Sequence, residues 1–265
     1  MSKLPKRIAR GVYQVSAGGV NAFLIDLDDD PRRVASPVPG AAAAGNGGPA
    51  KAGRAADPGG LVLIDTGTER GLRPIGEAIR ALGRTPDELR GIVVTHLHGD
   101  HTGSLAEIMR RTGAEVWMQR EDAEAVRAGV FSRPLEPGPG LVRTGLVRVI
   151  GGRMGATKEP IAVEHDVQDG DTLPFAGLVA VFTPGHTAGH VSLLLPRDGG
   201  VLFVGDAATN LGRLSWGPIY ENVSEGRESL AKLAALDFEV AAFAHGRPIL
   251  AHAAERFRKR WPPSA

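Results

Sequence analysis

One stretch decides the fold of this chain: Thr95-His96-Leu97-His98-Gly99-Asp100-His101-Thr102-Gly103. It places three imidazoles and a carboxylate within six residues, directly after the apolar residues 92–94. Burying so many unpaired polar groups at the end of a core strand is costly, and a metal ion that takes up their lone pairs offsets that cost. Neutral imidazoles and carboxylates are ligands for zinc and related transition metals. The stretch therefore predicts a metal site rather than a hydrogen-bonded surface loop.

The spacing of these residues indicates where the metal lies. His96 and His98 are two residues apart, so on an extended backbone they point to the same side. Asp100 and His101 follow at the turn into the next segment and can face the same cavity from another direction. A helical ligand pair would be spaced three or four residues apart. The pattern therefore predicts a site at a strand-to-helix turn.

Further ligand candidates follow three more apolar runs downstream. Residues 179–182 lead to His186, residues 201–204 lead to Asp206, and residues 240–244 lead to His245. A rigid sheet can gather side chains from several strand ends at one edge. We therefore expect these three side chains to join the stretch at 96–101.

The order and intervals of these residues resemble the metallo-β-lactamase superfamily. Residues 63–67, Leu-Ile-Asp-Thr-Gly, resemble its early Asp-Thr-Gly turn, and residues 183–190 resemble its Thr-Pro-Gly-His-Thr segment. The resemblance covers about residues 11–248. It implies an α/β (α+β) fold, a four-layer αββα sandwich with the metal site at one edge of the two sheets. Because it has His101, the chain resembles the glyoxalase II, lactonase and arylsulfatase-like hydrolases more than the β-lactamases proper.

Carried over position by position, the resemblance implies a binuclear site. The first metal would be held by His96, His98 and His186. The second would be held by Asp100, His101 and His245, with Asp206 bridging both. The resemblance implies two zinc ions, with iron or manganese as alternatives. Asp100 would also be catalytic, because it could orient the nucleophile and pass a proton to the leaving group.

The expected function is that of a metal-dependent hydrolase. Two metal ions lower the pKa of a shared water, and the resulting metal-bridged hydroxide can attack a small ester, thioester or lactone. The sequence contains no cysteine, which excludes thiol catalysis. One alternative is an oxidoreductase similar to the persulfide dioxygenases, which use a single iron held by a subset of these ligands. Another is a non-catalytic metal-binding protein.

Other residues near the motifs allow two interpretations each. Asp65 can accept a hydrogen bond from a ligand imidazole or can stabilise its own turn, and the resemblance favours the first. His190 is interpreted as supporting the ligands from behind, or as packing, rather than as a ligand. Trp216, Ile219 and Tyr220 could contact an apolar acyl group or could anchor their loop to the core.

Composition indicates an ordinary enzyme with one core. At 265 residues and net charge +1, we expect a single domain over 1–265, with a flexible Ala/Gly/Pro-rich insertion at about 28–60. The near-zero charge gives no reason to expect a nucleic-acid partner, and no apolar run is long enough to cross a membrane. The absence of cysteine and of a signal-like segment favours the cytoplasm. We expect a small-molecule substrate, and the sequence leaves the oligomeric state open.

Periodicity predicts the regular elements on either side of these motifs. Strands are expected at 11–14, 22–27, 61–64 and 114–118. Helices are expected at 72–82, at about 105–109, at 121–128 and at about 225–236.

Overall fold

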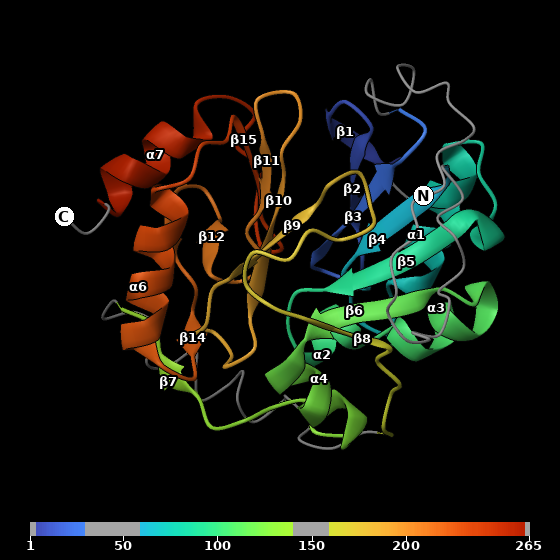
Figure 1. The fold of residues 1–265 in the computed structure, drawn as a ribbon, viewed down its shortest axis with the longest axis horizontal. Helices are drawn as coiled ribbons and strands as arrows, with labels where there is room; N and C mark the ends of the chain where they lie inside the picture. The colour runs from blue at the N-terminus through green and yellow to red at the C-terminus, as the bar shows by residue number, and fades with distance from the viewer. Residues whose placement is uncertain (1–3, 30–58, 140–158, 263–265) are drawn as a thin grey trace, which may run out of the picture.

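The computed structural model describes residues 4–29, 59–139 and 159–262 of the chain (Figure 1). Seven strands form the first sheet, in the spatial order β1 (Lys6–Ala9), β2 (Val12–Ser16), β3 (Asn21–Asp26), β4 (Leu61–Ile64), β5 (Leu89–Val94), β6 (Glu115–Gln119) and β8 (His165–Val167). Four strands form the second, in the order β15 (Val240–Ala242), β11 (Val201–Phe203), β10 (Val191–Leu195) and β9 (Val179–Phe182). Two small pairs are the other strands of the described residues: β12 (Ala208–Asn210) with β13 (Leu214–Trp216), and β14 (Ile219–Tyr220) with β7 (Glu136–Pro137).

Helices cover the outer faces of the two sheets. In Figure 1, helices α6 and α7 lie at one side of the molecule, α1 and α3 lie at the other, and the strands lie between them. Within the described residues the helices are α1 (Leu72–Ala81), α2 (Gly99–Thr102), α3 (Leu105–Thr112), α4 (Arg120–Arg127), α6 (Val223–Ala234) and α7 (Ala253–Arg260), with a short 3₁₀ helix, η2 (Pro86–Glu88). This arrangement is the predicted αββα sandwich.

Alternation along the strands explains why the layers stack in this order. In β4, Leu61 and Leu63 pack in the core that contains α1, α3 and α4, whereas Val62 and Ile64 pack between the sheets. In β11, Phe203 faces the space between the sheets and Leu202 packs with α6 and α7. Successive side chains of a strand point to opposite faces, so strands buried on both faces are apolar throughout. Both sheets therefore contribute to a shared central core and to an outer core of their own.

The carboxyl ends of strands from both sheets meet at one edge. Strands β4, β5, β6 and β8 are parallel, as are β11 and β15, so the ends of these strands point the same way within each sheet. The two sheets are joined there by a backbone hydrogen bond of 2.9 Å from Val191 N to Thr95 O. A second connection, also 2.9 Å, runs from Asn21 N to Ala244 O. The segments that follow β5, β9, β11 and β15 are therefore held close together.

The predicted elements occur close to their expected positions, but several elements were not predicted, among them β12 and β13. The strand Lys6–Ala9 was not predicted, because it has only one buried residue, Ile8, and no clear alternation. Helix α6 begins at Val223, two residues before the predicted start, because the Asn222 side chain accepts hydrogen bonds from Ser224 N and Glu225 N.

Part of the chain lies outside the described residues, and some predictions stay untested there. The predicted flexible insertion at 28–60 falls largely within 30–58, which are not described, and the single domain over 1–265 stays a prediction. Among the helices that are described, none combines the length and the apolar character needed to span a membrane.

Candidate metal centre

The turn after β5 places the histidine-rich stretch at the edge where the sheets meet. His96 lies two residues after the end of β5, His98 is the residue before α2, and Asp100 and His101 lie in the helix itself. The His98 carbonyl accepts hydrogen bonds from His101 N at 2.9 Å and from the Thr102 hydroxyl at 3.1 Å. This local structure fixes the helix against the extended residues before it.

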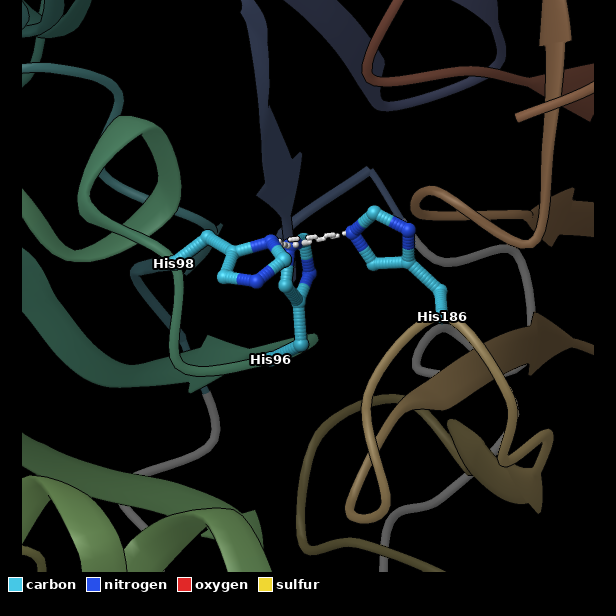
Figure 2. Close-up of side chains that lie close together, drawn as sticks. All are labelled: His96, His98 and His186. Carbon is cyan, nitrogen blue, oxygen red and sulfur yellow. Dashed lines mark hydrogen bonds between the residues drawn. The ribbon is translucent and has the colours of Figure 1, made fainter. Parts of the chain in front are cut away.

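Three histidines converge in the interior of the protein, as Figure 2 shows. His96 Nε2 lies 3.1 Å from His98 Nδ1, and His186 Nε2 lies 3.2 Å from the first and 3.0 Å from the second of these atoms. All three side chains are buried, with at most 1% of each residue exposed. The ring nitrogens thus form a small triangle that excludes bulk water.

The hydrogen bonds behind two of these rings determine which nitrogen carries the lone pair. His186 Nδ1 donates to the Ile219 carbonyl at 2.9 Å, so its Nε2 is unprotonated in the neutral ring. The Thr95 hydroxyl donates to the Asp65 carboxylate at 2.9 Å. His96 Nδ1 therefore donates to the Thr95 oxygen at 3.1 Å, which leaves the lone pair of His96 on Nε2.

The triangle is suited to a cation. Lone pairs that face each other at this distance repel, and a metal ion between them removes the repulsion. The rest of the site supports this interpretation, because His101 Nε2 and Asp206 Oδ1 are buried with no hydrogen-bond partner among the described residues. Unpartnered buried polar atoms are rare in folded proteins, and the donor set of imidazoles and carboxylates fits zinc or a similar ion.

A second group lies beside the triangle and is more exposed to solvent. Asp100, His101 and His245 offer ligand atoms within 4.8 Å of one another. His245 Nε2 lies 3.3 Å from Asp100 Oδ2, and the two side chains are 25% and 36% exposed. A substrate can therefore reach this group from solvent, whereas the triangle is closed off.

Asp206 lies between the two groups. Its Oδ2 is 3.5 Å from His186 Nε2 and 3.2 Å from His245 Nε2. Its Oδ1 is 3.6 Å from His101 Nε2, and the residue is 4% exposed. The structure thus brings together all seven residues that the sequence proposed as ligands.

Asp65 and His190 contact the site from behind. Asp65 adopts the left-handed backbone conformation at φ 57°, and its Oδ2 accepts a hydrogen bond of 2.8 Å from His101 Nδ1. That bond leaves the His101 lone pair on Nε2, facing Asp206. His190 Nε2 accepts a hydrogen bond of 3.0 Å from Asp206 N, so its Nδ1 donates to the Thr183 hydroxyl oxygen at 2.9 Å. Asp65 and His190 thus each bond directly to a residue that the sequence proposed as a ligand, and their supporting role stays a prediction.

Burial and charge divide the site into two electrostatic halves. Burial, reinforced by the neighbouring imidazoles, lowers the pKa of His96 and His98 well below its ordinary value, and burial also lowers the pKa of His186. At the second group the carboxylates dominate. The Asp206 charge raises the pKa of His245 to about 10. Burial works against a raised pKa at His101, but Asp65, Asp100 and Asp206 together outweigh it.

Metal uptake should therefore release protons. In the metal-free protein at neutral pH, His101 and His245 hold protons on the lone pairs that a metal needs, whereas the histidines of the triangle are already neutral. Metal affinity of the second group should rise with pH until the pH passes the His245 pKa of about 10. Calorimetric titration in buffers of different ionisation enthalpy measures this release. His245→Ala should release fewer protons, and uptake by the wild type without release would contradict the expectation.

The structure also bears on the two interpretations of Trp216, Ile219 and Tyr220. Trp216, Ile219 and Tyr220 are buried, and the Tyr220 hydroxyl donates to Ala207 O at 2.9 Å, so they anchor their loop to the core.

Two further residues contact the site but were not predicted. Asn21 donates from Nδ2 to Phe243 O and Gly246 O, both at 2.9 Å, and holds the turn that carries His245. A polar residue at the head of the apolar run 22–25 was the available signal for Asn21. Asp122, a buried residue of α4 that accepts hydrogen bonds from Leu97 N and Gly189 N, was not predicted either.

Comparison with known proteins gives a family match and several relatives. A family model described as the metallo-beta-lactamase superfamily matches residues 46–245. A probable metallo-hydrolase, YflN of Bacillus subtilis, is 29% identical over 218 residues, which cover 73% of this chain and 78% of YflN. A hydroxyacylglutathione hydrolase of Rhizobium meliloti is 30% identical and covers 64% of this chain. The N-acyl homoserine lactonase AttM of Azorhizobium caulinodans is 32% identical over 50% of this chain and 46% of its own length.

The chain spans about half the length of the hydroxyacylglutathione hydrolases it matches, 52% for that of Rhizobium meliloti. Among solved structures, MEM-A1, a subclass B3 metallo-beta-lactamase isolated from a soil metagenome library, has a TM-score of 0.62. It is 22% identical and covers 92% of this chain and 80% of its own. At this identity the likeness supports the fold alone.

Proposed function

The chain belongs to the metallo-beta-lactamase superfamily, and we propose that it is a metal-dependent hydrolase acting on a small ester, thioester or lactone. The observation that carries this proposal is the buried triangle of histidine nitrogens at 3.0–3.2 Å, with Asp206 in contact with it and with the second, solvent-exposed group. A protein that only bound metal for structural purposes would have no need for the exposed group.

Two zinc ions fit the proposed site. The triangle of His96, His98 and His186 would hold one, and Asp100, His101 and His245 would hold the other, with Asp206 bridging. When bound, such ions supply a water of lowered pKa and polarise the oxygen of the carbonyl under attack.

The protein's own groups have separate tasks in this proposal. Asp100 is exposed enough to contact the substrate, and its carboxylate can orient the attacking water and pass a proton to the leaving group. Asp65 keeps the His101 ring in the tautomer that a metal requires. Because the three histidines of the triangle are buried, a substrate would approach from the face that carries the partly exposed Asp100 and His245.

The substrate class rests on the relatives together with the site. Two relatives are named for a glutathione acyl conjugate and for a homoserine lactone, which are both compounds with an activated acyl carbon. We extend this class to the present chain, with a small molecule as substrate and the cytoplasm as location.

The test combines metal analysis with a substrate panel. Protein purified without chelator, from cells supplied with zinc and iron, should contain about two zinc ions per chain and hydrolyse members of a panel of lactones, thioesters and esters. His186→Ala removes one corner of the triangle and should lose the activity. The matched control is His165→Ala. His165 lies in β8, the edge strand of the first sheet, where it bonds Glu115, and its side chain is 38% exposed. One iron per chain with oxygen uptake on persulfides, and no hydrolysis, would overturn the proposal in favour of a dioxygenase.

A further inference from the structure

A buried carboxylate that is not among the proposed ligands lies behind the three-histidine triangle. Asp122 is in the first turn of α4 and is 0% exposed. A carboxylate is rarely buried to this extent unless it is fully paired. Its partners therefore indicate what it does.

Each oxygen of Asp122 accepts two hydrogen bonds from different parts of the chain. Oδ2 accepts from Leu97 N at 3.1 Å and from the Thr187 hydroxyl at 2.6 Å. Oδ1 accepts from Gly189 N at 3.1 Å and from Arg133 Nη1 at 2.8 Å. Leu97 lies between two histidines of the triangle, and Thr187 directly follows the third. One carboxylate thus connects the two loops that supply the triangle.

The contact between Asp122 and the second loop leaves no room for a side chain. A Cβ atom added to Gly189 would lie 2.5 Å from Asp122 N and 2.7 Å from Asp122 Cβ. Real Cβ atoms do not approach other atoms so closely, so any larger residue at position 189 would push the loop away. The glycine allows the backbone of this loop to rest directly on the start of α4.

Arg133 and Glu221 complete the charge balance around the loop. Besides Asp122, the Arg133 guanidinium contacts Glu221 Oε2 at 3.4 Å. Glu221 Oε2 accepts a hydrogen bond from Ala188 N at 2.8 Å, and Glu221 N donates to Gly185 O at 2.8 Å. The backbone on both sides of His186 is therefore bonded to one connected network, which has a positive charge between two negative ones.

We propose that Asp122 is a positioning residue, which holds the loop of His96 and His98 at a fixed distance from the loop of His186. This inference rests on the proposed metal site. The triangle is assembled from two segments separated by 90 residues in the sequence, so its 3.0–3.2 Å spacing depends on how the segments are held together. Metal–ligand distances fall within about 0.2 Å of their usual values, and hydrogen bonds from both loops to one buried carboxylate limit how far the loops can move apart.

The test compares Asp122→Asn with the wild type in metal affinity. The amide keeps the size of the carboxylate but replaces one of its oxygens with a nitrogen that donates hydrogen bonds. That nitrogen would face the two donors that bond to the oxygen in the wild type. We expect metal affinity at the triangle, measured by competition with a chromophoric chelator, to fall about 10- to 100-fold. The visible absorption spectrum of the cobalt-substituted protein should change as well, because it reports the geometry of the ligands. The matched control is Glu124→Gln, the same change at an exposed position of the same helix.

A purely structural role predicts a different result. If Asp122→Asn lowers the melting temperature of the metal-free protein but keeps the affinity and the cobalt spectrum of the wild type, the proposal is overturned. Should this variant fail to fold, Thr187→Val removes only the hydroxyl bond to Asp122: weaker metal binding supports the proposal and unchanged binding overturns it. These readouts need no substrate, so a wild type that binds metal and hydrolyses nothing would refute the proposed function and leave the positioning role to be decided by affinity.

Discussion

Replacing Asp206 with alanine should strip metal from the protein and abolish hydrolysis while leaving most of the fold intact. Asp206 is the carboxylate that contacts His186 in the triangle and both His101 and His245 in the second group. Losing a residue that supports a ligand typically costs 10- to 100-fold in affinity or activity, and losing a shared ligand should cost more. The fold should survive because the Asp206 backbone bond to His190 remains available in the variant.

Three measurements check this expectation on the same preparation: metal per chain by elemental analysis, kcat/KM on the best substrate of the panel, and the melting temperature. Asp87→Ala is the matched control, because Asp87 is an exposed carboxylate in η2. It should retain metal and activity. Full activity of Asp206→Ala would rule out the bridging role.

Removing the metal from the wild type should lower its stability as well as its activity. In the metal-free protein, His101 and His245 can bind protons in place of the metal, but burial keeps the histidines of the triangle neutral and their lone pairs opposed. A ligand that binds only the folded state stabilises it by about 4.1 kcal/mol when its concentration is 1,000 times Kd. We therefore expect a loss of several kcal/mol on chelation.

Chemical denaturation before and after chelation, followed by titration with zinc, measures the effect. The free energy of unfolding should rise with zinc concentration and activity should return with it. Asp206→Ala serves as the control, since a variant that holds no metal should show little response to the chelator. Equal stability of wild-type protein with and without metal would show that the triangle needs no cation.

Local sequence patterns predicted most of the fold and the side chains that gather at the candidate metal centre. Strand β4 is apolar at every position and is bounded by Gly60 and Asp65, so its place in a buried sheet is fixed by composition alone. The candidate ligands lie in the segments that follow such strands, and a polar cluster after a core strand is conspicuous. By contrast, β12 and β13 form a hairpin in which Ala208 pairs with Trp216, and both pack in one core with Tyr220. The sequence presents this segment only as a loop with aromatic residues.

Asp122 could not be recognised in the same way, because it stands in the charged run at 120–122, which is typical of a solvated start of a helix. Its burial depends on Arg133 and on two loops that are distant in sequence. The available signal was its position four residues before Val126, on the face of α4 that also buries Ala123. A carboxylate on the apolar face of a helix therefore indicates hydrogen-bond partners elsewhere in the chain.

The division of the site between the two sheets has a consequence for how long a folded molecule lasts. The candidate ligands after β5 belong to one sheet, and those after β9, β11 and β15 belong to the other, so that His96 and His186 are 90 positions apart in the sequence. Contacts of such long range cost loop-closure entropy and form late in folding. Interactions that are absent from the transition state slow unfolding without speeding folding. Bound metal should therefore prolong the lifetime of each folded molecule while leaving its rate of formation almost unchanged.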